Sequence, residues 1–329
     1  MRDERKRTGR ESSSSGGLIL AITLFLAILT GCTSNDRPDD RSVTDTGRNE
    51  ASQDRPPAGT IIDAYGDTIE LPRELPHFIS LAPNLTETVF ALDGEDRLLA
   101  RTDYCDYPPE AEEVESVGTL GSYNFERIVT LDPDLILMMT FDGSSRREYD
   151  RLKELGLRPV AFAEGDLESV IRMIDTVGRV IGQGKQGASL SRGLLAELDS
   201  LRELNRGVEP IPVFVVIDQA PLMTVSGGFI TSMVEAAGGR NVAEGNPVAY
   251  PRYSREALLT DRPEVILIPG LDPDAPARFL ERYPEAANTP AGRNGRIITI
   301  DPNLLARPGP RVIEGVTGVR RGLQLVDSG

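Results

Sequence analysis

Tryptophan is absent from this 329-residue chain, and aromatic residues make up only 5% of it. The chain has one histidine and two cysteines, too few soft ligands for a structural zinc site. A single histidine also argues against a histidine-based catalytic triad. Basic residues are scarce relative to acidic ones, 36 against 51, and the formal net charge of −15 argues against nucleic acid as a partner.

The first 31 residues have the pattern of a targeting segment. Basic residues precede the apolar stretch Leu18–Leu29, which is too short to span a bilayer comfortably. The stretch ends in Leu29-Thr30-Gly31-Cys32, which resembles the lipobox of bacterial lipoproteins, where the cysteine is lipidated and becomes the first mature residue. A signal anchor or a plain secretory signal is the alternative. We therefore expect a signal peptide over 1–31 and a lipoprotein anchored to a membrane, in the periplasm or at the cell surface.

Residues 32–59 contain a single valine and no aromatic residue, so they cannot bury enough apolar surface to offset the entropy of ordering. They are predicted to be a disordered acidic tether. With Cys32 lipidated, Cys105 is the other thiol and no disulfide can form within the mature chain. Cys105 is then a thiol near a metal centre or, as free cysteines usually are, a small buried residue.

From Thr60 onward, β-like and helix-like runs alternate. The expected strands are Phe78–Leu81, Leu98–Arg101, Leu135–Met138, Pro159–Phe162, Val213–Ile217, Val265–Ile268 and Ile297–Ile300. The expected helices are Asn84–Leu92 (capped by Asn84 or Thr86), one closing at Ile128–Leu131, Tyr149–Leu155, Phe229–Ala237 and Ala277–Tyr283. This order predicts an α/β fold with mainly parallel sheets and helices on both faces.

An internal repeat indicates two related lobes. NFERIVTLDPDLILM, from Asn124, aligns with SREALLTDRPEVILI, from Ser254, at a constant offset of 130 residues. Each copy reads as a helix with an early glutamate, a turn broken by proline, and a buried strand. Glu126 falls on Glu256 in this alignment.

The segment between the two copies, Glu168–Leu204, reads as helical except for Gly182–Gly187. That run satisfies G-x-G-x-x-G, but a helical pattern precedes it where a dinucleotide site needs a strand, so a break between two helices is favoured. Leucines then recur at helical spacing over Gln186–Asn205, predicting one helix of roughly 30 Å that joins the lobes. The expected organisation is an N-terminal lobe over 60–165, a connector over 166–206 and a C-terminal lobe over 207–329.

Several segments resemble a known class of proteins. They are SLAPNLTETVFAL (Ser80–Leu92), DYCDYPPEA (Asp103–Ala111), VGTLGSYNFERIVTLDPDLIL (Val117–Leu137), AYPRYSREALL (Ala249–Leu259) and ARPGPRV (Ala306–Val312). The chain resembles the periplasmic substrate-binding proteins of vitamin B12, haem and ferric-siderophore uptake, and most of all the cobalamin-binding members. The resemblance implies two lobes joined by a backbone helix, a ligand cleft between them, and delivery of the ligand to an ABC importer. We expect no catalytic residues, no cofactor and no resident metal, because the sequence shows no constellation of residues that would serve them.

The resemblance also implies a set of ligand-contacting positions. They are Asn84, Tyr104, Leu120, Met139, Met223, Tyr250, Asn303 and Arg307. Cobalamin binders hold Trp or Phe at several of these positions, whereas this chain offers Tyr, Leu and Met, which can still pack on the apolar rim of a corrin. The alternative for the Leu and Met positions is ordinary core. Arg307 is expected to meet solvent or a ligand amide or phosphate rather than a buried carboxylate.

Glu126 and Glu256 are implied to dock on arginines of the two importer permease subunits. The alternative is that each is an acid at a helix N-terminus, which stabilises the helix by about 0.3–1 kcal/mol. The expected partners are thus a corrinoid and an importer, with the membrane reached through the lipid anchor alone and the protein itself a monomer.

The same residues bear on other possible functions. A doubly wound α/β enzyme would need a nucleophile, a base or a cofactor loop, and a zinc or manganese receptor would need more than the isolated His77, which is expected at the surface. A haem receptor remains open, with Tyr104, Tyr107 or Tyr123 as axial ligand. An anionic ferric siderophore would call for several basic residues. A corrinoid scavenger without its own importer is a further alternative.

Overall fold

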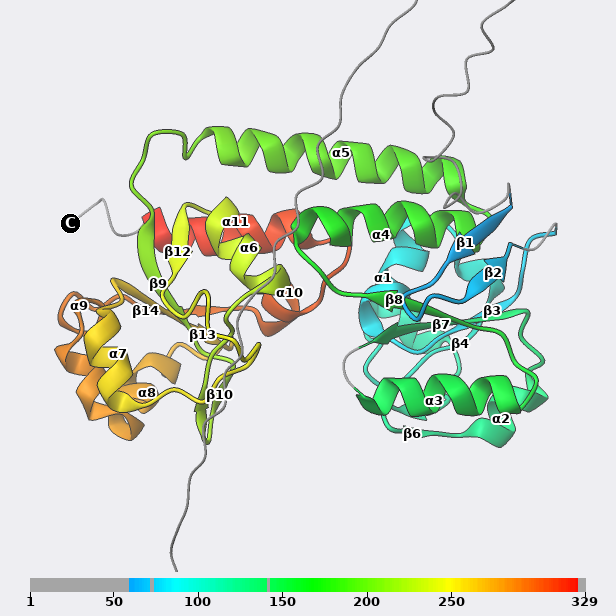
Figure 1. Ribbon diagram of the computed structural model, residues 1–329, viewed down its shortest axis with the longest axis horizontal. Helices are drawn as coiled ribbons and strands as arrows, with labels where there is room; N and C mark the ends of the chain where they lie inside the picture. The colour runs from blue at the N-terminus through cyan, green and yellow to red at the C-terminus, as the bar shows by residue number, and fades with distance from the viewer. Residues whose placement is uncertain (1–58, 72–73, 141–142, 325–329) are drawn as a thin grey trace, which may run out of the picture. The chain divides into compact units, whose positions relative to one another are not determined.

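Two parallel four-stranded sheets, one in each half of the chain, form the framework of this protein in a computed structural model (Figure 1). The structure describes residues 59–71, 74–140 and 143–324, which all belong to one compact unit. The expected signal peptide, the lipidated Cys32 and nearly all of the tether lie outside the described residues.

The N-terminal lobe alternates strand and helix, as the sequence predicts. Its elements are β3 (Phe78–Ser80), α1 (Pro83–Ala91), β4 (Leu98–Ala100), α2 (Phe125–Thr130), β7 (Leu135–Thr140), α3 (Gly143–Glu154) and β8 (Pro159–Ala163). The strands lie in the order β4-β3-β7-β8, and every pair is parallel. Because side chains alternate across a strand, Leu135 and Leu137 of β7 face one core cluster while Ile136 and Met138 face another. Both faces of the sheet are therefore buried.

The C-terminal lobe repeats this topology. Its elements are β9 (Ile211–Val215), α6 (Gly228–Ala236), β12 (Gly239–Asn241), α7 (Arg255–Asp261), β13 (Val265–Pro269), α8 (Ala275–Arg282) and β14 (Ile297–Ile300). The strand order β12-β9-β13-β14 matches that of the first sheet element by element, again with parallel pairs. The fold class expected from the sequence is confirmed.

The structure reproduces the 130-residue repeat in detail. The side chains of Asn124 and Ser254 cap α2 and α7, each accepting a hydrogen bond from the backbone amide three residues on. The residues that follow these helices, Asp132 and Arg262, adopt left-handed backbone conformations with φ of 48° and 49°, each directly before a proline. The two lobes therefore share their local geometry as well as their strand order.

The connector is a pair of helices, as the sequence predicts. α4 (Leu167–Val180) and α5 (Gly184–Glu203) are joined by a short turn that contains Gly182 and Gln183. The other four residues of the G-x-G-x-x-G run belong to α5, so the break is shorter than expected. A Cβ atom on Gly187 would lie 3.2 Å from the Cα atom of Gly178, so these two glycines let the helices pack closely. Figure 1 shows α5 extending over both lobes. In the described part of the chain, no helix is both long and apolar enough to cross a membrane.

One hydrophobic core runs through both lobes. It includes Leu85 of α1, Ile174 of α4 and Met233 of α6, together with Val316 of α11 (Val312–Gln324). Two smaller clusters lie on the outer faces of the two sheets. Since protein interiors are close-packed, any movement of one lobe against the other has to preserve or repack this shared core.

Short elements complete the fold, and the sequence patterns did not predict them. They are the hairpins β1 (Thr60–Ile62) with β2 (Thr68–Glu70), β5 (Gly118–Thr119) with β6 (Ser122–Tyr123), and β10 (Asp218–Gln219) with β11 (Leu222–Met223), and the helices α9 (Pro290–Arg293) and α10 (Pro302–Ala306). Three 3₁₀ segments span Glu95–Arg97, Pro109–Glu113 and Pro284–Asn288. Strands of two or three residues are too short for an alternating pattern to stand out.

Candidate functional site

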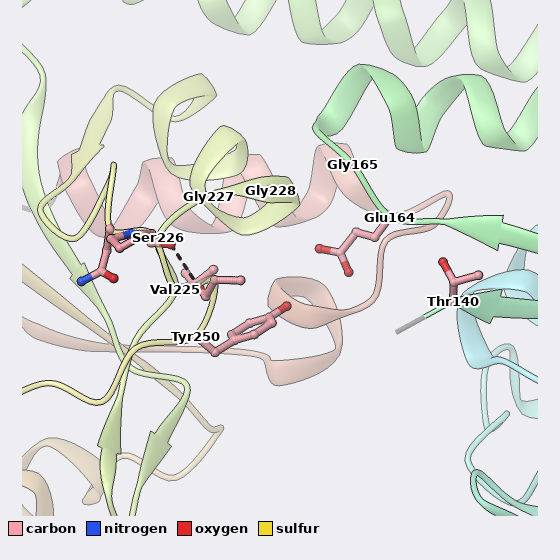
Figure 2. Close-up of a pocket in the computed structure, with 11 residues that line it drawn as sticks. Thr140, Glu164, Gly165, Val225, Ser226, Gly227, Gly228 and Tyr250 are labelled. Atoms are coloured by element: carbon pink, nitrogen blue, oxygen red, sulfur yellow. Dashed lines mark hydrogen bonds between the residues drawn. The ribbon is translucent and has the colours of Figure 1, made fainter. Parts of the chain in front are cut away.

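A cleft of about 570 Å³ lies between the two lobes (Figure 2). The N-terminal lobe contributes Thr140, the last residue of β7, and Glu164 and Gly165, which follow β8. The C-terminal lobe contributes 225–228, which lead into α6, and residues of the 246–250 loop that follows β12. The cleft thus opens at the carboxyl ends of parallel strands, where α/β proteins usually bind their ligands.

Backbone hydrogen bonds fix the loop that carries Tyr250. The Thr224 amide donates to the Pro251 carbonyl at 3.1 Å, and the Ser226 amide donates to the Ala249 carbonyl at 3.0 Å. The buried Asn241 side chain donates to the Val225 carbonyl at 2.7 Å and so anchors the segment that pairs with this loop. Tyr250 is therefore held between two backbone contacts while its ring stays 47% exposed.

Glu164 faces the same space as the Tyr250 hydroxyl (Figure 2). The Phe229 amide in the first turn of α6 favours the ionised carboxylate, but burial outweighs it and raises the pKa of Glu164. Burial also raises the pKa of Tyr250, and the negative charge of Glu164 adds to the effect. Sequence reasoning missed Glu164. Its position just after the carboxyl end of a buried strand was the available signal.

Of the eight predicted ligand residues, Tyr250 lines this cleft. Asn84 and Met139 lie together in the shared core region, with the Asn84 amide nitrogen 3.4 Å from the Met139 sulfur and 3.0 Å from the Pro308 carbonyl oxygen to which it donates. Both side chains are buried, at 3% and 2% exposure. The Asn84 amide and the Met139 side chain are thus already engaged in contacts within the protein.

The remaining predicted positions lie in loops or at element ends. Tyr104 follows β4 and is 59% exposed, and Leu120 lies in the turn of the β5–β6 hairpin and is 50% exposed. Met223 lies half-buried on β11, and Asn303 lies half-buried in α10, just after the carboxyl end of β14. Tyr104 and Asn303 therefore follow the carboxyl ends of strands in opposite sheets, the ends at which the cleft opens.

Arg307 contacts the buried carboxylate of Glu87 and the exposed one of Asp106, so the expectation that it faces solvent or ligand rather than a buried carboxylate was wrong. Its Nη1 atom lies 3.1 Å from Glu87 Oε1 and 2.6 Å from Asp106 Oδ1. Arg311 donates to Glu87 through Nε and Nη2, and its guanidinium lies 3.8 Å from the centre of the Tyr107 ring. The Glu87 side chain is 2% exposed and needs this compensation. A lone arginine in a loop gave no sign of a carboxylate 220 positions away.

One family of known proteins matches most of this chain. The periplasmic binding protein family matches residues 79–304, a span that takes in both sheets and the connector. The chain belongs to this family. It is 30% identical to the vitamin B12-binding protein of Photorhabdus laumondii over 238 residues, 71% of this chain and 83% of the relative. It is also 30% identical to the vitamin B12-binding protein of Vibrio cholerae, over 73% of this chain and 86% of the relative.

Solved structures agree with the family assignment. The periplasmic vitamin B12 binding protein BtuF of Vibrio cholerae superposes with a TM-score of 0.68 at 28% identity, covering 78% of this chain and 99% of that one. The periplasmic heme-binding protein BhuT, in complex with two hemes, gives a TM-score of 0.65 at 27% identity, covering 75% and 97%. Corrinoid and haem binders are thus both represented among the relatives of this periplasmic binding protein.

The thiol and the histidine of this periplasmic binding protein occupy ordinary structural positions. Cys105 is fully buried, with its sulfur 3.1 Å from the Thr102 hydroxyl, as expected for a small buried residue. The His77 side chain is 59% exposed, as expected, and its amide donates to Asp134. Tyr123, one of the three candidate haem ligands, is buried, and that burial strongly raises its pKa. Within the described ranges, no group of three or more His, Cys, Asp and Glu residues could hold a metal ion.

Glu126 and Glu256 occupy equivalent sites in the two lobes. Both are exposed in the first turns of α2 and α7, and an exposed apolar side chain follows each by three residues, Val129 and Leu259. Hydrogen bonds from its own amide and from the Ser254 hydroxyl lower the pKa of Glu256. In Figure 1, α2 and α7 both lie on the side of their lobe away from α5. Neither glutamate lines the cleft described above.

Proposed function

We propose that this solute-binding protein is a lipid-anchored receptor that captures cobalamin or a related corrinoid and delivers it to an ABC importer. The family and the class of solute-binding protein are established by the comparisons. The identity of the ligand, the lipid anchor and the importer are what the proposal adds. The protein acts by binding and release, without catalysis.

The character of the cleft carries the choice of ligand. Its wall presents the Tyr250 ring, backbone-rich glycine segments and apolar groups, with Glu164 as the charged residue among its lining. Tyr104 and Leu120 add exposed apolar surface on the loops of the N-terminal lobe. A corrin is a broad ring with a largely apolar rim and neutral amide arms, so it suits a wall of this kind. Relatives named as vitamin B12-binding proteins support the same choice.

We propose that the predicted ligand set acts in two tiers. Tyr104, Leu120, Met223, Tyr250 and Asn303 contact the ligand. Asn84, Met139 and Arg307 act behind them, because their side chains are engaged with Pro308, the shared core and the Glu87 cluster. Their contribution is to hold the loops that carry the first group.

Titration of the purified protein tests the ligand. Cyanocobalamin, cobinamide, haem and a ferric siderophore are added in turn, and binding is followed by calorimetry and by the ultraviolet–visible spectrum. The proposal expects tight binding of the corrinoids. Absence of corrinoid binding alongside tight binding of haem or the siderophore would overturn it.

Haem is the second candidate, because the haem-binding neighbour shares the fold at 27% identity. The exposed Tyr104 phenol is the available axial ligand, since Tyr123 is buried and Tyr107 lies against Arg311. Haem binding through Tyr104 would give a tyrosinate absorption band that Tyr104→Phe removes. Corrinoid binding predicts no such dependence on the phenol.

The proposed anchor and organisation rest on the sequence. We propose that cleavage before Cys32 leaves a lipidated monomer with a 32–59 tether, lobes over 60–165 and 207–329, and a 166–206 connector. Periplasmic residence agrees with the family. Mass spectrometry of protein extracted from membranes should give the lipidated mature mass, and Cys32→Ser should release the protein into the soluble fraction. A full-length, unlipidated chain in the membrane would indicate a signal anchor instead.

A further inference from the structure

Glu164 is a fixed feature of the cleft wall. It follows β8 directly, and the Leu167 amide, at the start of α4, donates to the Ser232 hydroxyl of α6 at 3.0 Å. The Phe229 amide, at the N-terminus of α6, favours the ionised form of the Glu164 carboxylate. A methyl group placed on Gly228 would lie 3.7 Å from Glu164 Oε1, so the carboxylate rests close against that turn. Glu164 thus joins the N-terminal lobe to the first turn of a helix in the other lobe.

Among the described residues that line the cleft, no basic side chain compensates this charge. The described residues that line it are otherwise uncharged: Thr140, Gly165, Val225, Ser226, Gly227, Gly228, Asn246, Pro247, Ala249 and Tyr250. The two arginines of the neighbouring cluster, Arg307 and Arg311, are paired with Glu87 and Asp106. The burial that raises the pKa of Glu164 shows that its lost hydration is not fully replaced.

We infer that Glu164 selects the ligand by charge, favouring one that brings a hydrogen-bond donor or a positive charge to this point of the cleft and rejecting one that brings a carboxylate. The inference rests on the proposed function for the class of ligand, a corrinoid, whose neutral primary amides are the donors. A carboxylate arm in place of an amide would meet the Glu164 carboxylate in a low-dielectric wall with no cation to bridge the two. An ionised carboxylate accepts hydrogen bonds more strongly than a neutral amide does.

The test compares paired ligands and paired variants. Wild type, Glu164→Gln and the matched control Glu154→Gln, an exposed residue at the end of α3, are titrated at pH 8 with two ligand pairs. One pair is a corrinoid with intact side-chain amides and the same corrinoid with those amides hydrolysed to carboxylates. The other is haem and its dimethyl ester. Circular dichroism and thermal melting verify that each variant folds.

The expected result is a preference of wild type for the uncharged member of each pair it binds, by roughly 10-fold or more, as for loss of one charge-assisted hydrogen bond. In Glu164→Gln, the dissociation constants of the two members of a pair should differ by no more than about threefold. Glu154→Gln should leave the ratio unchanged. The readout is the ratio of two affinities, so a general loss of binding by a variant would not imitate it.

The outcomes separate the two claims. Equal wild-type affinity for both members of a pair, or a preference retained in Glu164→Gln, would overturn the role of Glu164 while leaving corrinoid binding intact. Haem binding without corrinoid binding would overturn the proposed function, and the ratio for haem and its ester in the two proteins would then decide the role of Glu164. Failure of wild type to bind all four ligands would overturn both.

Discussion

Replacing Glu87 by alanine tests the buried ion cluster that joins α1 to the segment before α11. Glu87 accepts hydrogen bonds from Arg307 at 3.1 Å and from Arg311 at 2.8 and 2.7 Å. In the variant, Arg307 keeps its ion pair with Asp106, whose charged atoms lie 2.6 Å apart in the structure. Arg311 keeps its contact with the Tyr107 ring, but its ion pair in the described structure is lost.

The expected loss of stability follows from this geometry. Removing one partner of a buried ion pair costs about 3–5 kcal/mol, because the other charge stays buried without compensation. The two guanidiniums are mostly buried, with side-chain exposures of 16% and 14%, so water screens them little. Asp106 compensates one of the two. We therefore expect Glu87→Ala to lower the free energy of unfolding by about 3–4 kcal/mol, the lower part of that range.

Urea unfolding followed by circular dichroism measures this loss, with Glu115→Ala as the control. Glu115 lies 2.6 Å from Arg127, a shorter contact than any that Glu87 makes. The two side chains of this pair are far more exposed, however, at 43% for Glu115 and 40% for Arg127. Exposed pairs of this kind contribute little to stability, so the control should keep the midpoint of wild type. A loss below about 1 kcal/mol in Glu87→Ala, or equal losses in the two variants, would refute the argument from burial.

Further predictions concern the cleft and the two lobes' outer helices. Tyr104→Ala and Tyr250→Ala should each weaken corrinoid binding by about 1–3 kcal/mol in calorimetry, as expected for partly buried aromatic contacts. Glu126→Arg combined with Glu256→Arg should leave ligand affinity within about threefold of wild type, since neither residue lines the cleft. The same double variant should abolish uptake through the cognate importer in a cell assay, because like charges would face each other at the docking site. Glu164→Gln should be at least as stable as wild type at neutral pH. Burial raises the folded-state pKa of Glu164, so the stability that its protonated form contributes is present at low pH and is lost as pH rises through that pKa. Glutamine resembles the protonated acid, so the two proteins should have the same stability in acid.

Each of these has an outcome that contradicts it. Wild-type affinity in both tyrosine variants would place the ligand elsewhere. Normal uptake by the double arginine variant would leave Glu126 and Glu256 as ordinary acids at helix N-termini. A Glu164→Gln variant that is less stable than wild type at neutral pH, with the gap closing in acid, would show that the carboxylate is stabilised, not destabilised, by the fold. Tyr250 adds nothing to this comparison, because burial and the charge of Glu164 raise its pKa and its phenol stays protonated from acid to neutral pH.

The sequence predicted the framework because the framework is periodic. Buried strands such as Leu135–Thr140 are continuous apolar runs, and the 130-residue repeat made the second lobe follow from the first. The N-terminus of α1 was predicted less well. Ala82 is the N-cap and Pro83 begins the helix, whereas the Asn84 amide reaches Pro308 and the Thr86 hydroxyl donates to Ser80. A capping preference is local and gives no information about a partner far along the chain.

The site was harder to predict, because its residues depend on partners that are distant in the sequence. Loops with no periodic pattern build the cleft, and their positions depend on pairings such as Thr224 with Pro251 that only the folded chain brings together. The pairing of Arg307 with Glu87 was missed because burial of an acid in an amphipathic helix cannot be read from its neighbours. Resemblance to a family pointed to Tyr250, and the structure added Glu164 beside it.

The shared core also affects how the chain completes its folding after synthesis. Helix α11, the last element described, packs Val312, Val316 and Val319 into the same cluster as Ile174 of the connector. Until that helix has been made, the earlier elements have an uncovered apolar surface, the condition under which nascent chains associate wrongly or are degraded. A nascent chain that ends before α11 would lack part of the core of both lobes. The first half of the chain is therefore fully protected from aggregation and proteolysis only once α11 has packed against it.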